Sequence, residues 1–479
     1  MNIRKTKIIC TVGPAIESEK MLIKMFEAGM NVARLNFSHG DISESVKRIA
    51  RIRTASAKTN KYVGIMLDTK GPEIRTGNFV NDEVYFNEGD IVKIVSEEIL
   101  GNNERFYVNC KELFSDISVG DEVLIDDGKM SLSVISKTDE EFNCRVNTSG
   151  VIKNKKGINV PGVKLSMPFV SEKDYNDIKF GCEQGFDLIA LSFVRREEDI
   201  LEVRKLLKEF GRPNMEIIAK IECQEALNNL EGIIKTADGI MVARGDLGVE
   251  IAQELVPLYQ KQMIKMANHF GKPVITATHM MESMISSPRP TRAETSDVAN
   301  AILDGSDAIM LSGESAIGKY PVESVKYMDK IARAVEATID YEKLLNDNQK
   351  YNQHSKNDAI GACVAQCCLT LDKVEAIMAF TETGGTAKRI CKYRPNAPIV
   401  ACTNTPETCR KLSYYWGVYP VIVNYIDDIS MCDEIAKEVA ESLGINKNAN
   451  IIITSGFGQK HGVTNTISCL LYTSDAADE

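Results

Sequence analysis

Short apolar segments recur along most of the chain, and amphipathic helical patterns lie between them. No glycine-rich dinucleotide-binding turn follows any of these segments. Because strands that alternate with helices form right-handed βαβ units, eight such units favour a closed barrel over an open sheet, and we predict an α/β fold built on a (β/α)8 TIM barrel. The predicted barrel strands are residues 7–12, 31–36, 62–68, 187–193, 216–222, 239–244, 273–278 and 307–312.

Two regions depart from this alternation. Between about 71 and 168 the segments become short and alternating, with the turn sequences NEGD, DDG and KKG, which predicts a small β-domain inserted in a βα loop, where it could act as a lid. After a polar stretch at 346–357, four more strand-like segments predict a C-terminal α/β domain. The predicted divisions are 1–70 with 169–344 for the barrel, 71–168 for the lid, 345–467 for the C-terminal domain, and 468–479 for a tail that we interpret as non-native.

Composition and charge exclude several classes of function. A chain of 479 residues, 44% hydrophobic and 26% charged, is typical of a globular protein with several domains. Its formal charge of −10 argues against binding to nucleic acid or to an anionic membrane, and no apolar stretch is long enough to span a membrane. Thirteen cysteines without a CxxC pair, and only five histidines, indicate a reducing cytoplasm rather than a disulfide framework or a zinc site.

Charged and polar residues stand at the C-terminal ends of the predicted barrel strands. One segment ends with Lys220 and Glu222, and the next is followed by Asp246. In a TIM barrel these ends face a single cavity, so residues at the ends of other strands should join them. Each one taken alone is more often structural, but their convergence favours a functional site. The other candidates are Arg34, Asn36, Ser38, Asp68, Thr69, Lys70, Thr278 and Ser312.

The residue types at this face suit metal-assisted phosphoryl transfer. Glu222 and Asp246, with few histidines in the chain, fit Mg²⁺, although either carboxylate could instead form an ion pair with Lys220 or Arg244. Lys220 and Arg34 would supply the fixed positive charge that a transferring phosphoryl group needs. A strand end that opens a helix offers backbone N–H groups to a carboxylate, a weak pattern formed by Ala243, Arg244, Gly245 and Asp246.

Six motifs, in this order, resemble those of the pyruvate kinase family: MNVARLNFSHG at 30–40, LDTKGPEIRTG at 67–77, IAKIE at 218–222, VARGDLG at 242–248, PRPTRAE at 288–294 and MLSGE at 310–314. The resemblance extends from Lys5 to about Ile467. It implies a catalytic TIM barrel, an inserted small β-barrel lid, a C-terminal α/β regulatory domain and a homotetramer. The implied reaction is the last step of glycolysis, in which phosphoenolpyruvate and ADP give pyruvate and ATP.

The resemblance also implies roles for individual residues. Glu222 and Asp246 would hold Mg²⁺ or Mn²⁺, and Lys220 and Arg34 would contact the phosphoryl group. Residues 243–246 and Thr278 would bind the substrate, and Thr278 and Ser312 would belong to the route that protonates the enolate, whose proton donor stays open. The implied potassium ligands are Asn36, Ser38, Asp68 and Thr69, and the implied nucleotide contacts are Arg75, His39, Asn36, Lys156 and Asp127.

Three further features bear on regulation and on departures from the family. Glu73 stands where potassium-dependent members carry Glu and potassium-independent members carry Lys, and His279 stands where Gln is common. We also expect the chain to lack, after Ile467, the final strand seen in relatives. A loop that resembles the family's effector site would bind a sugar phosphate or AMP, although an ordinary helix cap is an equal alternative; it comprises Thr381, Glu382, Thr383, Gly384, Gly385 and Thr386.

Two other classes of protein are weighed against this interpretation. The first is another metal-dependent barrel acting on phosphoenolpyruvate or pyruvate, such as an aldolase or a phosphotransferase with a phosphohistidine. It would call for a mobile histidine domain, and the five scattered histidines do not indicate one. A catalytically inactive protein that only senses metabolites or binds partners would be expected to lack Lys220, Glu222 or Asp246, and all three are present.

Overall fold

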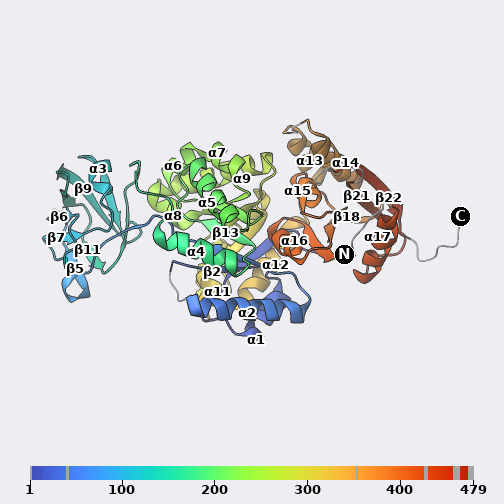
Figure 1. The fold of residues 1–479 in the computed structure, drawn as a ribbon, viewed down its shortest axis with the longest axis horizontal. Helices are drawn as coiled ribbons and strands as arrows, with labels where there is room; N and C mark the ends of the chain where they lie inside the picture. Colours follow the sequence, from blue (N-terminus) through green and yellow to red (C-terminus); the bar gives the residue numbers. More distant parts are fainter. Residues whose placement is uncertain (1–2, 39–41, 352–353, 425–429, 457–463, 473–479) are drawn as a thin grey trace.

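The computed structural model describes residues 3–38, 42–351, 354–424, 430–456 and 464–472. Its centre is a closed parallel barrel with the strand order β1-β17-β16-β15-β14-β13-β3-β2, which confirms the predicted TIM barrel (Figure 1). Every predicted barrel segment contains one of these strands, although most strands are one or two residues shorter. The strands are β1 (Lys7–Thr11), β2 (Val32–Asn36), β3 (Gly64–Asp68), β13 (Leu188–Leu191), β14 (Glu216–Ile221), β15 (Gly239–Ala243), β16 (Val274–Ala277) and β17 (Ala308–Leu311).

Helices cover the outside of the barrel, as the helical spacing of apolar residues predicts. Within α5, for example, Ile200, Val203 and Leu207 share one face and are fully buried against the strands. Local sequence fixes the helix starts, since Thr291 and Glu294 form a reciprocal capping box at α10. The helices are α1 (Glu19–Ala28), α2 (Ile42–Thr59), α4 (Glu172–Glu183), α5 (Glu197–Glu209), α6 (Gln224–Asn228), α7 (Leu230–Thr236), α8 (Arg244–Glu250), α9 (Val256–His269), α10 (Arg292–Leu303), α11 (Gly313–Ala316) and α12 (Pro321–Glu336).

The segment between β3 and β13 forms a separate β-domain at one end of the molecule (Figure 1). It contains a seven-stranded sheet of order β4-β12-β8-β9-β10-β6-β7, a two-stranded sheet of β11 and β5, and a hydrophobic core of its own. Its elements are β4 (Ile74–Arg75), β5 (Glu83–Phe86), β6 (Ile91–Val95), β7 (Arg105–Tyr107), α3 (Leu113–Asp116), β8 (Glu122–Ile125), β9 (Met130–Lys137), β10 (Glu141–Val146), β11 (Gly150–Lys153) and β12 (Gly157–Asn159). We call this β-domain the lid.

The C-terminal α/β domain is built on a five-stranded sheet of order β20-β19-β18-β21-β22, in which only the pairing of β22 with β21 is antiparallel. Its strands are β18 (Val374–Phe380), β19 (Ile399–Thr403), β20 (Val418–Ile422), β21 (Asn450–Ser455) and β22 (Thr466–Leu471). Its helices are α13 (Tyr341–Gln349), α14 (Lys356–Thr370), α15 (Gly385–Lys392), α16 (Pro406–Lys411) and α17 (Met431–Ser442).

The expectation that the chain lacks the final strand after Ile467 is wrong, because residues 466–471 form β22. Ser468 pairs with Ile453 and Cys469 with Ile452 in β22, and Tyr472 is only 6% exposed within the core on the α17 side of the sheet. The backbone ladder and the burial of Leu470 and Tyr472 hold this short segment, which has too few residues to show a clear alternating pattern. Residues 473–479 lie outside the described part of the chain.

The C-terminal domain packs against the N-terminal ends of the barrel strands, at the opposite end of the barrel from the lid (Figure 1). Apolar side chains from inside the barrel, such as Ile218 and Met241, belong to the same core cluster as Tyr414 and Trp416 of this domain. Three buried carboxylates at these strand ends pair with its cations: Asp187 with Arg410, Glu216 with Lys388, and Asp307 with Arg394.

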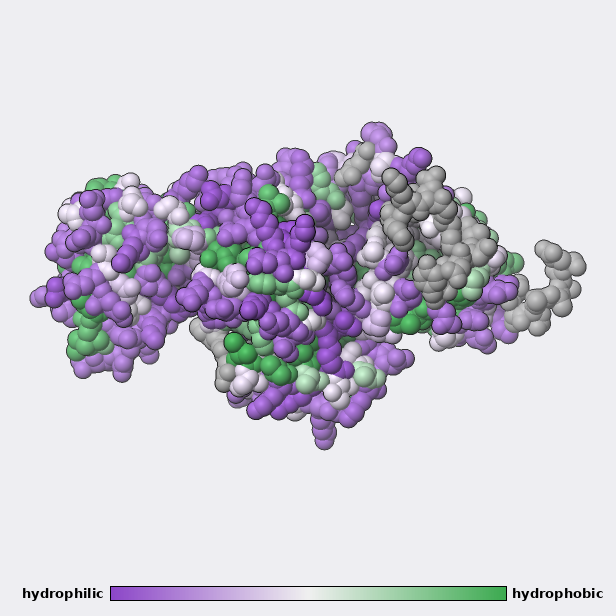
Figure 2. Space-filling model, viewed as in Figure 1, coloured by the Kyte–Doolittle hydropathy of each residue, from purple (hydrophilic) through white to green (hydrophobic). Residues whose placement is uncertain are grey.

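The face of the molecule seen in Figure 2 is mostly hydrophilic, with apolar residues in small groups over the barrel and the lid. In the described residues no helix combines the length and the apolar character needed to cross a bilayer.

Candidate active site

Four charged side chains form an alternating chain at the C-terminal ends of the barrel strands. Arg34 Nε donates to Asp68 Oδ2 at 2.6 Å, Lys220 Nζ lies 3.3 Å from Asp68 Oδ1, and Lys220 Nζ lies 2.8 Å from Glu222 Oε1. Arg34 comes from β2, Asp68 from β3, and Lys220 and Glu222 from the end of β14. The structure therefore brings together the positive and negative groups that the strand ends predicted.

The central cation of this chain is buried yet charged. Burial by itself lowers the pKa of Lys220, but Asp68, Glu222 and Asp246 outweigh it and raise that pKa above its ordinary value. Burial also acts to raise the pKa of Asp68, and Arg34 and Lys220 more than offset it, so the pKa of Asp68 is lowered. Lys220 and Asp68 are thus both ionised at neutral pH. Asp68 lies between Lys220 and Arg34 and fixes these two positive charges in place.

Ser192 is a site residue that sequence reasoning missed. Its hydroxyl accepts a hydrogen bond from Lys220 Nζ at 2.8 Å and donates one to the Thr69 carbonyl at 2.6 Å, which orients the lysine. No site residue was predicted from the strand that ends here, because a single serine at a strand end carries no distinctive pattern. The signal available was its position at the C-terminal end of a predicted barrel strand.

Glu222 has the properties expected of a ligand to a divalent cation. It is 0% exposed, its Oε2 accepts from the Phe193 backbone N–H at 2.6 Å, and its Oε1 faces Lys220 Nζ at 2.8 Å. Burial raises the pKa of Glu222 to about 7, and the charge of Asp246 adds to this effect while Lys220 opposes it. Since a bound cation would relieve the repulsion between the Glu222 and Asp246 carboxylates, the residues present fit Mg²⁺ or Mn²⁺.

In the described residues no group of three or more His, Cys, Asp or Glu side chains is arranged to hold a metal. A cation at Glu222 and Asp246 would therefore have two protein carboxylates and would take its other oxygen ligands from water or substrate. Mg²⁺ is commonly bound in this way in enzymes that act on phosphates.

The predicted potassium ligands lie on the neighbouring ends of β2 and β3. Asn36 pairs in register with Asp68, Asn36 Oδ1 accepts from the Ser38 N–H at 3.0 Å, and Thr69 Oγ1 accepts from the Ser192 N–H at 3.1 Å. The four residues thus lie at or just after the adjacent C-terminal ends of β2 and β3, at the barrel rim.

Glu73 and Arg75 form a two-bonded ion pair at the start of the lid. Arg75 donates from Nε to Glu73 Oε2 at 2.9 Å and from NH2 to Oε1 at 2.6 Å, and Lys70 lies 4.0 Å from Glu73. Arg75 also donates to the Lys155 carbonyl at 2.7 Å. Glu73 therefore holds the Arg75 side chain in one orientation. The two-residue spacing in the sequence did not reveal this contact.

Of the other predicted nucleotide contacts, Lys156 and Asp127 belong to the lid and Asn36 to the barrel. Lys156 pairs with Asp126 at 2.8 Å, whereas the exposed Asp127 lines the cavity between lid and barrel. Asn36 is exposed at the barrel rim, and His39 lies outside the described residues.

Arg244 points away from the centre of the site. It donates from NH1 to Asp297 Oδ1 at 2.7 Å and from NH2 to the Thr278 carbonyl at 2.6 Å, so its side chain joins α8, α10 and the end of β16. The Gly245 N–H donates to Thr278 Oγ1 at 2.9 Å, and Thr278 has a φ of 63°, an uncommon conformation for a β-branched residue. The described contacts thus give Arg244 a structural partner other than Asp246.

Ser312 and His279 lie at the rim of the same face. Ser312 precedes α11, and its backbone N–H donates to Glu314 at 2.8 Å. The exposed His279 lies 3.7 Å from Glu282.

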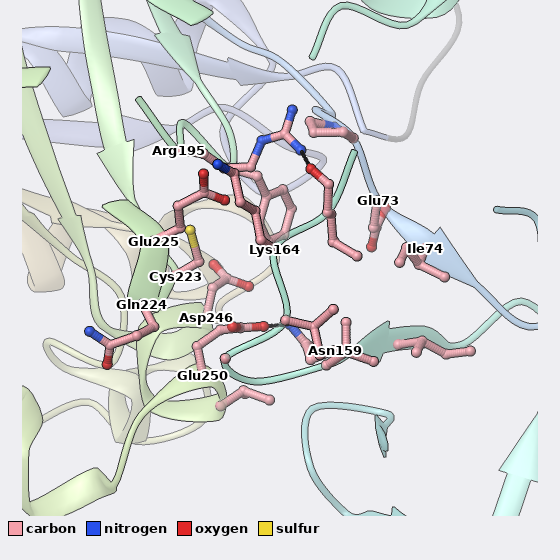
Figure 3. Close-up of a pocket in the computed structure, with 18 of the residues that line it drawn as sticks. Glu73, Ile74, Asn159, Lys164, Arg195, Cys223, Gln224, Glu225, Asp246 and Glu250 are labelled. Atoms are coloured by element: carbon pink, nitrogen blue, oxygen red, sulfur yellow. Dashed lines mark hydrogen bonds between the residues drawn. The ribbon is translucent and has the colours of Figure 1, made fainter. Parts of the chain in front are cut away.

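A cavity of about 350 Å³ separates the lid from the barrel (Figure 3). Asp246 and Cys223 reach it from the barrel, and Glu73 and Asn159 reach it from the lid. Asn159 Nδ2 donates to Glu250 Oε1 at 2.7 Å across this space. The cavity therefore adjoins the proposed metal ligands and has walls from both domains.

The predicted effector loop joins β18 to α15. Gly384 has a φ of 91°, and its N–H donates to Thr381 Oγ1 at 3.0 Å, while the buried Thr386 hydroxyl lies 2.9 Å from that of Thr464. Thr383 and Glu382 are exposed, and Gly385 begins the helix. Lys388 pairs with Glu216 and lines a cavity together with Glu382 and Thr383. Arg389 also lies close to the loop, with its NH1 3.4 Å from Thr464 Oγ1.

Comparison with known proteins identifies the relatives of this chain. A sequence profile described as pyruvate kinase, barrel domain, matches residues 3–325, and one described as pyruvate kinase, alpha/beta domain, matches residues 358–470. The chain belongs to the pyruvate kinase family. A pyruvate kinase of Geobacillus stearothermophilus is 50% identical over 456 residues, which are 95% of this chain and 78% of the relative. One of Bacillus licheniformis is 51% identical over 468 residues, 96% of this chain and 79% of the relative.

A solved structure supports the same assignment. The crystal structure of a pyruvate kinase from Cryptosporidium parvum matches with a TM-score of 0.94 and 39% sequence identity, and the match covers 98% of this chain and 96% of that one. As a member of the pyruvate kinase family, the chain is a phosphotransferase, and the family's reaction converts phosphoenolpyruvate and ADP into pyruvate and ATP. This assignment excludes an aldolase and a phosphotransferase that works through a phosphohistidine.

Proposed function

We propose that Lys220, Arg34, Glu222 and Asp246 carry out the pyruvate kinase reaction at the C-terminal face of the barrel. The observation that supports this most is the buried chain of alternating charges from Arg34 through Asp68 and Lys220 to Glu222. Glu222 and Asp246 would hold Mg²⁺ or Mn²⁺, which supplies a Lewis acid for the phosphoryl and enolate oxygens when bound.

Lys220 and Arg34 provide the electrostatic stabilisation. The bond between phosphorus and the enolate oxygen breaks as an oxygen of the ADP β-phosphate bonds to the phosphorus, and the enolate then takes a proton at carbon to give pyruvate. In the transition state negative charge is spread over the three oxygens of the transferring group. Arg34, oriented by Asp68, and Lys220, oriented by Ser192, stabilise this charge without reorganising. Residues 243–246 and Thr278 would hold the carboxylate end of the substrate, and Thr278 and Ser312 would lie on the route of the proton.

Asn36, Ser38, Asp68 and Thr69 would bind K⁺, and Arg75, Asn36, His39, Lys156 and Asp127 would contact the nucleotide. A monovalent cation between β2 and β3 adds positive charge close to Arg34 and Lys220. The Glu73 ion pair supports this proposal, because Glu73 keeps Arg75 oriented without adding net charge to the site. Closure of the lid over ADP would exclude water from the transfer.

The exposed part of the loop formed by Thr381–Thr386 would bind a phosphorylated effector, a sugar phosphate or AMP, with Arg389 as a cation beside it. The protein would act in the cytoplasm as a homotetramer. Size-exclusion chromatography with light scattering tests the assembly, and a mass near that of one chain would contradict it.

A lactate dehydrogenase-coupled assay tests the proposed reaction. Pyruvate should form only when phosphoenolpyruvate, ADP, Mg²⁺ and K⁺ are all present. An absence of pyruvate under these conditions, from protein with a cooperative melting transition, would favour the inactive metabolite-sensing protein instead.

A further inference from the structure

Arg195 connects the barrel to the segment that returns from the lid. Its side chain is 6% exposed, and it donates from NH1 to the Leu165 carbonyl at 2.7 Å and from NH2 to the Met167 carbonyl at 2.9 Å. Figure 3 shows its guanidinium extending from the barrel across the cavity wall to this segment. The return segment, residues 160–171, contains no helix or strand, so its backbone carbonyls depend on such partners.

The lid holds the same point of the chain from the other side. Between the two carbonyls that Arg195 binds, Ser166 donates from its backbone N–H to Asp116 Oδ2 at 2.7 Å and from its hydroxyl at 3.0 Å. Asp116 belongs to α3 of the lid. Residues 165–167 are therefore fixed to the barrel by Arg195 and to the lid by Asp116, which makes them a pivot between the two domains.

The loop that carries Arg195 also carries the contacts that orient the catalytic groups. Within four residues, Ser192 accepts from Lys220, the Phe193 N–H donates to Glu222, and Arg195 binds the pivot. The Arg195 backbone N–H donates to Asp199 at 2.8 Å and its carbonyl accepts from Asn229 at 3.0 Å, so the loop itself is held in place. A displacement of the pivot would therefore reach Lys220 and Glu222 through a short and well-anchored segment.

We propose that Arg195 is a positioning residue that fixes the location of the lid relative to Lys220 and Glu222. The planar guanidinium suits this role because its parallel N–H groups reach two carbonyls at once, whereas a lysine reaches them only with a freely rotating ammonium group. Arg195 Nε has no hydrogen-bond partner in the described structure and lies 3.8 Å from Asp199, so the fork toward the return segment is its principal set of contacts. The proposal rests on nucleotide binding between lid and barrel, as proposed above.

The test compares Arg195→Met, Arg195→Lys and Asp116→Ala with the parent enzyme. Arg195→Met should raise the KM for ADP about tenfold, the scale of losing one charge-assisted hydrogen bond, while kcat and the KM for phosphoenolpyruvate change less than about threefold. Arg195→Lys should recover part of this loss. Arg196→Met is the matched control, since the neighbouring Arg196 is exposed and pairs with Asp199 of its own helix at 3.7 Å, and it should keep the parent kinetics.

Two further measurements separate the pivot from a general loss of structure. Without substrates, amides of residues 160–168 should exchange faster in Arg195→Met than in the parent, while the melting temperature stays the same; this arm does not depend on catalysis and so tests the pivot even if the proposed nucleotide site is wrong. The combined Arg195→Met, Asp116→Ala variant should be affected less than the two single effects together, because both act at one point. Any of three results would overturn the proposal. Arg195→Met could show the parent's exchange rates at residues 160–168, or the two substitutions could have additive effects on the KM for ADP. Arg195→Met could also lose equally in every kinetic constant while its melting temperature falls.

Discussion

Lys388 and Glu216 form an ion pair across the junction between the C-terminal domain and the barrel. Glu216 is 4% exposed and also accepts hydrogen bonds from the hydroxyls of Tyr414 and Tyr415. It opens β14, and Lys220 lies four residues further along this strand. Because a strand inside a closed barrel is stiff, the contact joins the helix after the proposed effector loop to the strand that carries the central cation.

Replacing Lys388 with methionine should destabilise this junction. The change leaves the buried Glu216 carboxylate with only the two tyrosine donors, and loss of one charged partner costs about 2 kcal/mol. The melting temperature, measured by differential scanning fluorimetry, should fall by a few degrees. Lys350→Met is the control: this exposed lysine pairs with Asp347 on the surface, so its loss should leave the melting temperature unchanged. Equal behaviour of the two variants would contradict a structural role for the junction.

Replacing Lys220 with methionine should remove most activity without unfolding the protein. Losing one preorganised charge at a transferring phosphoryl group raises the barrier by roughly 3 kcal/mol or more, a loss in kcat of at least about a hundredfold. Pyruvate formation measures the effect, and the melting temperature serves as the check on folding. Turnover within a few-fold of the parent would show that Lys220 does not stabilise the phosphoryl group.

Activity should depend on potassium. In tetramethylammonium buffer pyruvate formation should be slow and should rise on addition of K⁺, because the oxygens of Asn36, Ser38, Asp68 and Thr69 would then hold a cation. Glu73→Lys should blunt this rise by bringing a fixed positive charge to the site. Glu73→Gln removes the charge of Glu73 without adding one, so it should keep the response to K⁺. Equal parent activity in both salts would rule out the potassium site.

The stability of the metal-free protein should depend on the ionisation of Glu222. The pKa of Glu222 is raised from 4.5 to about 7 in the folded state, so the folded state binds this proton more tightly than the unfolded state does. The stabilisation that results is complete below the unfolded pKa of 4.5 and is lost as pH rises through the folded pKa of about 7. The parent should therefore lose up to roughly 3 kcal/mol relative to Glu222→Gln between about pH 4.5 and 7. Added Mg²⁺ favours the ionised carboxylate, so it should restore parent stability near pH 7. A pH-independent difference between parent and variant would contradict the raised pKa.

An effector, if bound at Thr381–Thr386, should lower the apparent KM for phosphoenolpyruvate. Fructose 1,6-bisphosphate, ribose 5-phosphate, glucose 6-phosphate and AMP are each titrated against the parent, Thr383→Glu and Arg389→Met. The added carboxylate at the exposed Thr383 repels a phosphate, and Arg389→Met removes a cation beside the loop, so both variants should respond less. A substitution at Thr386 is less informative, because that hydroxyl is buried against Thr464. Identical responses in all three proteins would exclude this loop.

Regular patterns in the sequence were sufficient to predict the barrel and its charged face. Parallel strands buried on both sides leave continuous apolar segments, and the barrel topology then brings their ends together, which is why Lys220, Glu222, Asp68 and Arg34 could be grouped in advance. Tertiary pairings could not be predicted in the same way. The partners of Arg244 and Lys388 lie 53 and 172 residues away in the chain, and no local spacing records such a contact.

The pivot and the final strand were missed for related reasons. Arg195 binds backbone carbonyls, which every residue possesses, so the sequence does not indicate which residues it contacts. The short segment that forms β22 is stabilised by its pairing with β21 rather than by a propensity of its own. In both cases the information lies in the neighbours of the segment.

The continuous core shared by the barrel interior and the C-terminal domain has a consequence for how the molecule melts. Ile218 and Tyr414 belong to one apolar cluster, and the three buried ion pairs reinforce the same junction, so these two parts should lose structure together. The lid has a separate core and joins the barrel through two chain crossings. Heating should therefore divide the chain into two cooperative blocks, with the lid as the smaller one, and the boundary between them would run through the pivot at residues 165–167.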